Sequence, residues 1–441
     1  MTRDKQLKAR IRARMAKTGE RYTTARFHVL GDSDRPAVGQ VTDLGYALRG
    51  GVAADPSAVT NTIANIGVRR SDGSVVSEPL LFAASGGIGA LYILWEFKRH
   101  DAPVLTLGFN SRPQYPREWL TTTLNRLDMP YEMHTTSGAK SASARLSEEL
   151  DAGRPVIVLP DRYLLGYWHL PPNLEAQGGH FLVAYGEAGG RVHLDDRNLV
   201  PLTVARDDVD RARQRVVSYK NFLVSLRPRE LTLPDNALAD AVLEGLRDGA
   251  ELLAGTSESF ALPAWRSWAR RMTDERNAKG WPRVFADGRG LVGALLSVWE
   301  GVEPVGMTGG NLRSLFADSL TEAAELLRRP QLGDLAHEWR GIAQQWHDLA
   351  ETALPADHSP FGQMRELTAA IQESIIAEGD AGASAAATAA EELWTLRAKA
   401  DAGPPFDPAD MRALFEAMSE HVSGIYESER AAVEKLRGAL I

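Results

Sequence analysis

The chain opens with hydrophobic positions at helical spacing. Leu7, Ile11 and Met15 recur at intervals of four residues, and many positions between them are Lys or Arg. This pattern predicts a basic amphipathic helix, and we treat residues 1–30 as a basic helical arm. Such an arm either docks on the protein's own body, docks on a second subunit of a homodimer, or recruits an acidic peptide, a carrier protein or a membrane surface.

Short apolar runs alternate with helical stretches between residues 31 and 230. Asp55 and Pro56 predict the start of a helix, with Asp55 as its N-cap, and Gly67 ends it. Further helices are predicted at 117–128 and 140–152, and strands at 91–95, 104–108, 155–159, 180–185, 192–194 and 222–226. The later strands follow one another closely, and the segment EAGG at 187–190 has the composition of a hairpin turn. We therefore expect an α/β domain whose sheet is at least partly antiparallel.

After Pro228 the hydrophobic positions keep helical spacing to the end of the chain. The predicted helices cover 235–255, 258–277, 287–302, 309–328, 333–354, 362–378, 384–402 and 407–439. Tryptophans gather between 265 and 346 at helical spacings, which is typical of core packing. The predicted fold class is α+β, with an α/β domain over residues 31–230 and an all-helical domain over residues 231–441.

Composition and charge narrow the function classes. The 441 residues are 44% hydrophobic and 24% charged, which is typical of a globular protein of two or three domains. The net charge is −8 although residues 1–26 contain nine basic and two acidic residues, so the body is acidic and unsuited to broad nucleic-acid binding. No apolar run is long enough to span a membrane or to form a secretory signal, which predicts a cytoplasmic location.

The chain contains no cysteine, which excludes disulfides, thiolate metal sites and a cysteine nucleophile. Its ten histidines are scattered without the spacing of a metal site. We therefore expect neither a metal nor a cofactor.

The most informative segment for chemistry is GGHFLVAYG at residues 178–186, followed by VHLDDR at 192–197. A histidine at the start of one strand of a hairpin and an acid at the end of the next strand can lie close together. The acid would then hold one imidazole nitrogen and leave the other as a general base. His180 is the predicted base, and alternation along the strand leaves open whether Asp195 or Asp196 faces it.

The order of these motifs resembles the butirosin biosynthesis protein H N-terminal family. The resemblance rests on the helix near residues 56–67, EPLLFAASGGIG at 78–89, GGH at 178–180 and DDR at 195–197. The segment GGNLR at 309–313 and the helix after it are similar to a helical domain of unknown function that often follows this family.

The resemblance implies a papain-like fold with a Cys-His-Asp site that transfers an aminoacyl group from a carrier protein to an amine. By position, His180 matches the family's base and Asp196 its orienting acid. The family's cysteine lies at the start of the first helix, where this chain has Ala53-Ala54-Asp55. Ser57 is a candidate replacement nucleophile or a helix-capping residue, and Asp55 is a candidate acid or base.

Other residues are predicted to line the substrate pocket. Asp161 and Tyr163 end a strand, and Tyr167 and Trp168 lie in the loop before His180, so these four either contact substrate or support the loop. Gly87 and Gly179 complete this set, being glycines that allow close backbone approach.

These observations predict a natural-product tailoring enzyme that acts on a small-molecule, peptide or carrier-bound substrate through His180 and Asp196. Amide formation, cyclisation and epimerisation all remain open as its reaction. The alternatives are a catalytically inactive binding protein of a biosynthetic pathway and a serine-dependent hydrolase.

Overall fold

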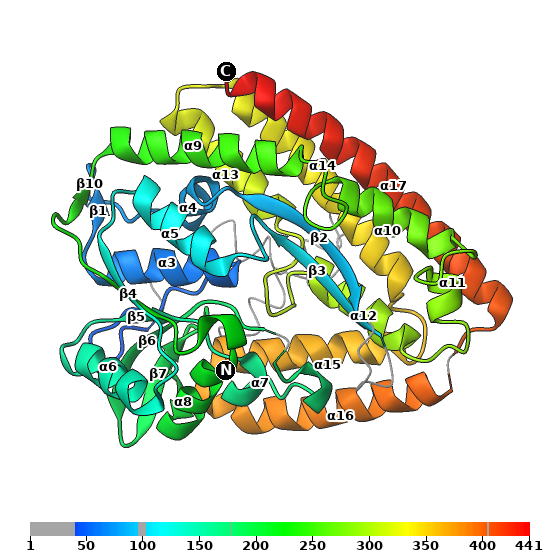
Figure 1. Ribbon diagram of the computed structural model, residues 1–441, viewed down its shortest axis with the longest axis horizontal. Coiled ribbons are helices and arrows are strands. Elements are labelled where there is room, and N and C mark those ends of the chain that lie inside the picture. The colour runs from blue at the N-terminus through cyan, green and yellow to red at the C-terminus, as the bar shows by residue number, and fades with distance from the viewer. Residues whose placement is uncertain (1–39, 96–102, 177, 404) are drawn as a thin grey trace, which may run out of the picture.

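The computed structural model describes residues 40–95, 103–176, 178–403 and 405–441. The predicted basic arm therefore lies outside the described residues. Figure 1 shows a sheet with flanking helices at one end of the molecule and a larger helical region that continues from it. The predicted α+β class is confirmed.

The main sheet has six strands in the order β4-β9-β5-β6-β7-β8, and every neighbouring pair in it is antiparallel. Its strands are β4 (Tyr131–His134), β5 (Val156–Val158), β6 (Leu182–Ala188), β7 (Arg191–Asp195), β8 (Leu202–Ala205) and β9 (Leu223–Leu226). Gly189 and Gly190, both with positive φ, form the tight turn between β6 and β7. β4 and β8 were not predicted, because each has only four residues, of which none in β4 and two in β8 are buried.

Helices cover both faces of this sheet. Helices α6 (Ala139–Asp151) and α8 (Arg206–Arg215) pack on one face, where Leu146 and Val209 meet Val156 and Leu182. Helix α3 (Ala54–Asn65) packs on the other face against β5 and β6. Alternate strand residues thus point into two separate cores, as the twofold repeat of a β-strand requires.

The start of helix α3 differs from the prediction. Ala53 is the N-cap, so the prediction of Asp55 in that role is wrong, and Pro56 is the third helical residue. The carboxylate of Glu78, at the start of α4 (Glu78–Ala84), accepts hydrogen bonds from the backbone N–H groups of Val52 and Ala53. Glu78 thus holds the two residues that precede the helix, while Asp55 is the second helical residue and its side chain does not cap the helix.

A second antiparallel pair, β2 (Ile88–Trp95) and β3 (Val104–Asn110), is separate from the main sheet. It packs against α10 and α12 of the helical region, as Figure 1 shows. A short parallel pair, β1 (Arg69–Arg70) and β10 (Thr232–Leu233), places one strand at the start of the region predicted to be all helical. One continuous core of buried side chains runs through both parts of the chain.

The helical region follows the predicted periodicity closely. Its helices are α9 (Asp235–Leu253), α10 (Pro263–Thr273), α11 (Trp281–Val284), α12 (Leu291–Val302), α13 (Arg313–Leu326), α14 (Gln331–Ala353), α15 (Phe361–Glu373), α16 (Ala383–Ala402) and α17 (Pro408–Ala439). α13 begins later than predicted, because Gly309, Gly310 and Leu312 have positive φ and cannot form helix. Among the described residues, no helix combines the length and apolarity needed to cross a membrane.

Candidate functional site

The candidate site lies between the ends of two neighbouring strands. His180 precedes β6 and Asp196 follows β7, and antiparallel pairing of these strands brings the two residues together. His180 Nε2 lies 2.7 Å from Asp196 Oδ1, and both side chains are almost fully buried. The other carboxylate oxygen of Asp196 accepts hydrogen bonds from the Tyr167 hydroxyl at 2.7 Å and the Trp168 indole at 3.1 Å.

These contacts determine which nitrogen of the His180 imidazole carries the proton. Burial by itself would raise the pKa of Asp196, but the charge and hydrogen bond of His180, together with the nearby Arg197, lower it to about 2. An ionised carboxylate only accepts hydrogen bonds, so Nε2 of His180 carries the proton. Nδ1 of His180 is buried and has no hydrogen-bond partner among the described residues. It is therefore the nitrogen available to take a proton from a bound molecule.

The lowered pKa of Asp196 predicts an acid-dependent loss of stability. Because the folded-state pKa of about 2 lies below the unfolded value, the contribution of Asp196 is present above about pH 4 and disappears as the pH falls toward 2. Between pH 5 and pH 2.5, urea unfolding should show a larger loss of unfolding free energy, by about 2 kcal/mol, in the wild type than in Asp196→Asn. Equal losses in the two proteins would contradict this assignment.

Asp195 lies on the opposite side of the strand and serves a different part of the structure. Its carboxylate accepts hydrogen bonds from the Tyr46 hydroxyl at 2.8 Å and the Asn61 amide at 3.0 Å. Burial raises its pKa to about 6. Of the two acids between which the sequence could not decide, Asp196 is the one that contacts His180.

Asp55 joins the start of α3 to the histidine strand. Its Oδ1 accepts a hydrogen bond from the backbone N–H of Phe181 at 2.8 Å, and its Oδ2 accepts one from the Asn110 amide at 3.2 Å. Burial raises its pKa, whereas these hydrogen bonds and the charge of His180 oppose the rise. The Phe181 contact also explains why the strand begins at Leu182 and not at His180 as predicted.

The Ser57 hydroxyl contacts Glu78, and the described contacts do not include one with His180. This hydroxyl donates to Glu78 Oε1 at 2.9 Å, and the Ser57 side chain is buried next to Gly51. A serine nucleophile needs a base within hydrogen-bond reach, and the base available to this hydroxyl is a carboxylate that already accepts backbone N–H groups. The geometry thus gives Ser57 a packing role in the first turn of α3, next to the loop that contains Gly51.

The predicted pocket residues fall into two groups. Tyr167 and Trp168 bind Asp196 directly, as described above. Asp161 caps the short helix α7 (Arg162–Leu165) by accepting from the N–H of Tyr163, and it also accepts from that of Ala176. The side chain of Tyr163 is partly buried, and its described contacts do not include His180.

The two predicted glycines serve close packing. A side chain at Gly179 would meet the carbonyl oxygen of Pro160, so glycine allows the segment before His180 to approach the end of β5. Gly87 has a φ of +64° and lies beneath Phe316 of α13. Its contacts connect the α/β part to the helical region.

Arg197 is a site residue whose role the sequence did not indicate, although it stands in the DDR motif. It is buried with a φ of +68°. Its guanidinium donates to the carbonyl oxygens of Val52 at 3.1 Å and Met307 at 2.5 Å. Arg197 thus ties the strand end that carries Asp196 to the loop before α3 and to the helical region.

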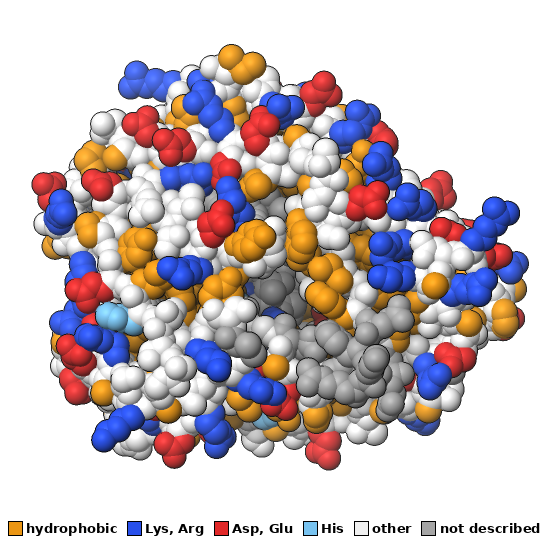
Figure 2. Space-filling model, viewed as in Figure 1, with side chains coloured by type: hydrophobic (Ala, Val, Ile, Leu, Met, Phe, Trp, Pro, Cys, Tyr) orange, Lys and Arg blue, Asp and Glu red, His pale blue; other side chains and the backbone are white. Residues whose placement is uncertain are grey.

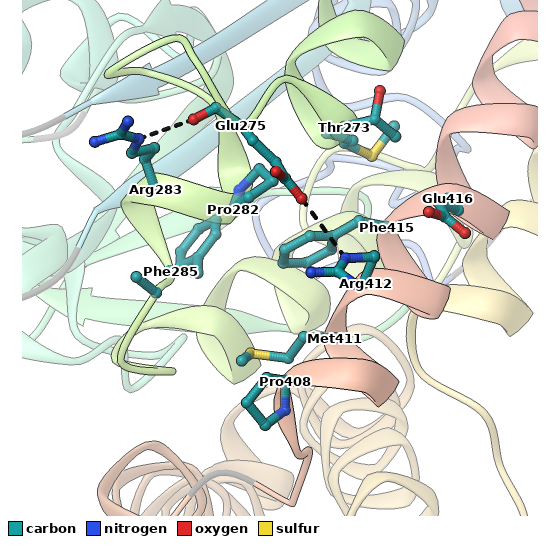
Figure 3. Close-up of a pocket in the computed structure, with 12 residues that line it drawn as sticks. Thr273, Glu275, Pro282, Arg283, Phe285, Pro408, Met411, Arg412, Phe415 and Glu416 are labelled. Atoms are coloured by element: carbon teal, nitrogen blue, oxygen red, sulfur yellow. Dashed lines mark hydrogen bonds and ion pairs between the residues drawn. The ribbon is translucent and has the colours of Figure 1, made fainter.

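A separate cavity of about 380 Å³ lies within the helical region between α10, α11 and α17. Figure 3 shows Met411 and Phe415 among its apolar lining and a Glu275–Arg412 ion pair across it. It contains none of the residues predicted for the site. No group of three or more His, Asp or Glu side chains with the arrangement of a metal site occurs within the described ranges.

Comparison with known families agrees with this organisation. The model of the butirosin biosynthesis protein H N-terminal family matches residues 56–197, and that of a domain of unknown function (DUF4872) matches residues 228–381. Residues 56–197 are therefore similar to the butirosin biosynthesis protein H N-terminal family, and the predicted order of the two regions is confirmed. The match indicates a biosynthetic, tailoring-type enzyme family. No curated protein matches the sequence significantly.

Proposed function

We propose that this protein is a biosynthetic acyltransferase that forms an amide directly, with His180 as general base and Asp196 as the residue that orients it. The observation that carries the proposal is the buried His180–Asp196 hydrogen bond of 2.7 Å, which leaves Nδ1 free. An imidazole held in this way has the tautomer that accepts a proton from a nucleophile.

In the proposed reaction, an acceptor amine attacks the carbonyl carbon of an acyl thioester on a carrier. His180 Nδ1 takes a proton from the amine nitrogen as the C–N bond forms. The C–S bond then breaks, and His180 returns the proton to the departing thiolate. The products are an amide and a free thiol, so His180 ends in its starting state and no other reactant is required.

Two features favour direct transfer over a covalent acyl-enzyme. The chain has no cysteine, and Ser57 donates its hydroxyl hydrogen to Glu78. A papain-like arrangement is part of the same proposal. It is supported by helix α3, whose first turn contacts the residue after His180 through Asp55.

Intact-protein mass spectrometry during turnover tests this proposal. The wild type and Ser57→Ala are incubated with acyl thioesters of a carrier protein and a panel of amines, and both protein mass and amide product are recorded. We expect product from both proteins without a mass increase on either.

An acyl adduct that disappears in Ser57→Ala would replace direct transfer with a serine mechanism. If the acyl thioesters or the amines bind to the protein but no amide is formed, the alternative of a catalytically inactive binding protein is favoured.

A further inference from the structure

The cavity between α10, α11 and α17 is separate from the candidate catalytic site and shares no residue with it. Its volume of about 380 Å³ is within the range of small-molecule sites. Met272, Phe285 and Phe415 line it although each is almost fully buried, whereas Ala286 and Pro408, which also line it, are exposed. The cavity therefore reaches from the surface into the hydrophobic core, whereas Figure 2 shows a different face of the molecule hollowed near its centre.

An aromatic cluster holds the apolar wall of this cavity in place. The Trp281 ring meets the rings of Phe285 and Phe415 edge to face, with centroid distances of 5.3 and 5.5 Å. The Trp281 indole also donates to the Tyr92 hydroxyl of β2 at 3.1 Å. Because Trp281 fixes both rings, the apolar wall exists before a ligand binds. Met411 has a flexible side chain in the same lining and can adapt to the shape of a bound molecule.

Two guanidinium groups converge on one residue at the exposed side of the cavity. The Nε of Arg283 donates to the backbone carbonyl oxygen of Glu275 at 2.8 Å, and the Nε of Arg412 lies 3.6 Å from the Glu275 carboxylate. The terminal nitrogens of both arginines have no hydrogen bond within the described part of the chain. Figure 3 shows these three residues together, with Glu416 on the far side of Arg412 from Arg283. Two positive charges therefore share one carboxylate here, and several donors are unused.

The ion pair between Glu275 and Arg412 is easily displaced. Both side chains are about two-thirds exposed, at 66% and 67%. Long, exposed ion pairs contribute little to stability, because water screens and solvates both charges. A ligand carboxylate can therefore take the place of the Glu275 carboxylate on Arg412, while the backbone contact keeps Arg283 in position.

We propose that this cavity binds a small hydrophobic carboxylic acid. The apolar body of the acid packs against Phe285, Met411 and Phe415, and its carboxylate accepts hydrogen bonds from Arg283 and Arg412. A guanidinium group matches the two oxygens of a carboxylate, and such charge-assisted hydrogen bonds are stronger than neutral ones. An amine of the same shape would meet two guanidinium groups and a carboxylate that is already paired. This ligand site is additional to the proposed catalytic site and does not depend on its chemistry.

Isothermal titration calorimetry on the full chain tests the proposal, with octanoate, decanoate and 4-phenylbutyrate as probes. We expect at least one of these acids to bind. The alcohol and the amine of the same carbon skeleton should bind at least about tenfold more weakly, since neither makes the charge-assisted contacts of the acid. Arg283→Gln and Arg412→Gln should each weaken binding of the acid by about tenfold. Glu275→Gln should strengthen it by up to about fivefold, because the competing carboxylate is gone.

Three further variants locate the binding site. Ala286→Phe places a ring in the cavity and should abolish binding. Arg430→Gln changes an exposed ion pair elsewhere on α17 and should leave binding unchanged, as should His180→Ala. The proposal is overturned if none of the three acids binds, if the alcohols bind as tightly as the acids, or if neither arginine variant weakens binding. Loss of binding in His180→Ala would also overturn it, since the acid would then occupy the catalytic site.

Discussion

Replacing His180 by Ala is expected to lower turnover by a factor of about 10²–10⁴ while the protein stays folded. His180 supplies the free Nδ1, and no other described histidine contacts Asp196. Asp196→Asn should cause a loss of the same order, because an amide nitrogen at this position would donate to Nε2 and shift the imidazole proton to Nδ1. Steady-state rates of amide formation give the measurement, and circular dichroism verifies the fold.

His193→Ala is the matched control for this prediction. His193 lies on β7, close to the site in sequence, and its ring packs near Tyr185 without contacting Asp196. Its removal should leave turnover within about twofold of the wild type, as expected for a change outside the proton path. Undiminished turnover in His180→Ala would refute the proposed base.

The largest expected effect on stability comes from the buried ion pair between Arg313 and Glu429. Two guanidinium nitrogens of Arg313 donate to the two carboxylate oxygens of Glu429 at 2.8 and 2.9 Å, and both side chains are fully buried. The indoles of Trp265 and Trp346 also donate to this carboxylate. Arg313 donates in addition to the carbonyl oxygen of Gly89, which links helix α13 to strand β2.

Removing one partner leaves the other as an uncompensated buried charge. Arg313→Ala and Glu429→Ala should each reduce the free energy of unfolding by about 3–5 kcal/mol, measured by urea denaturation. Replacing both residues with apolar ones, Arg313→Met and Glu429→Leu, should recover part of that loss, since the uncompensated charge is gone.

The exposed pair Lys435–Glu338 provides the comparison. Glu338→Ala should cost at most about 1 kcal/mol, because water screens and solvates both groups. A similar loss at the buried and the exposed pair would show that burial does not determine the contribution of Arg313 and Glu429.

Much of the local structure could be predicted from the sequence. Periods of two and of about 3.6 residues located six strands and most of the helices of the C-terminal region, because these repeats reflect which side chains must be buried. The motif order also predicted the family and singled out His180 together with two candidate acids. The absence of a cysteine nucleophile could also be read directly from the sequence.

The tertiary structure decided which of those residues meet. Strand register and the positive φ of Arg197 direct Asp196 toward His180, while Asp195 binds Tyr46 and Asn61 on the other side. Asp55 lies inside α3 and binds Phe181 and Asn110, whereas Glu78 reaches the residues just before that helix from a different element.

The ion pair between Arg313 and Glu429 likewise depends on how the helices of the C-terminal region pack. Local periodicity reports only the burial preference of each residue along its own element. Contacts between residues more than a hundred positions apart are set by sheet register and helix packing. The sequence by itself therefore determined the elements and the candidate base, and the tertiary structure determined the partner of that base and the charges around it.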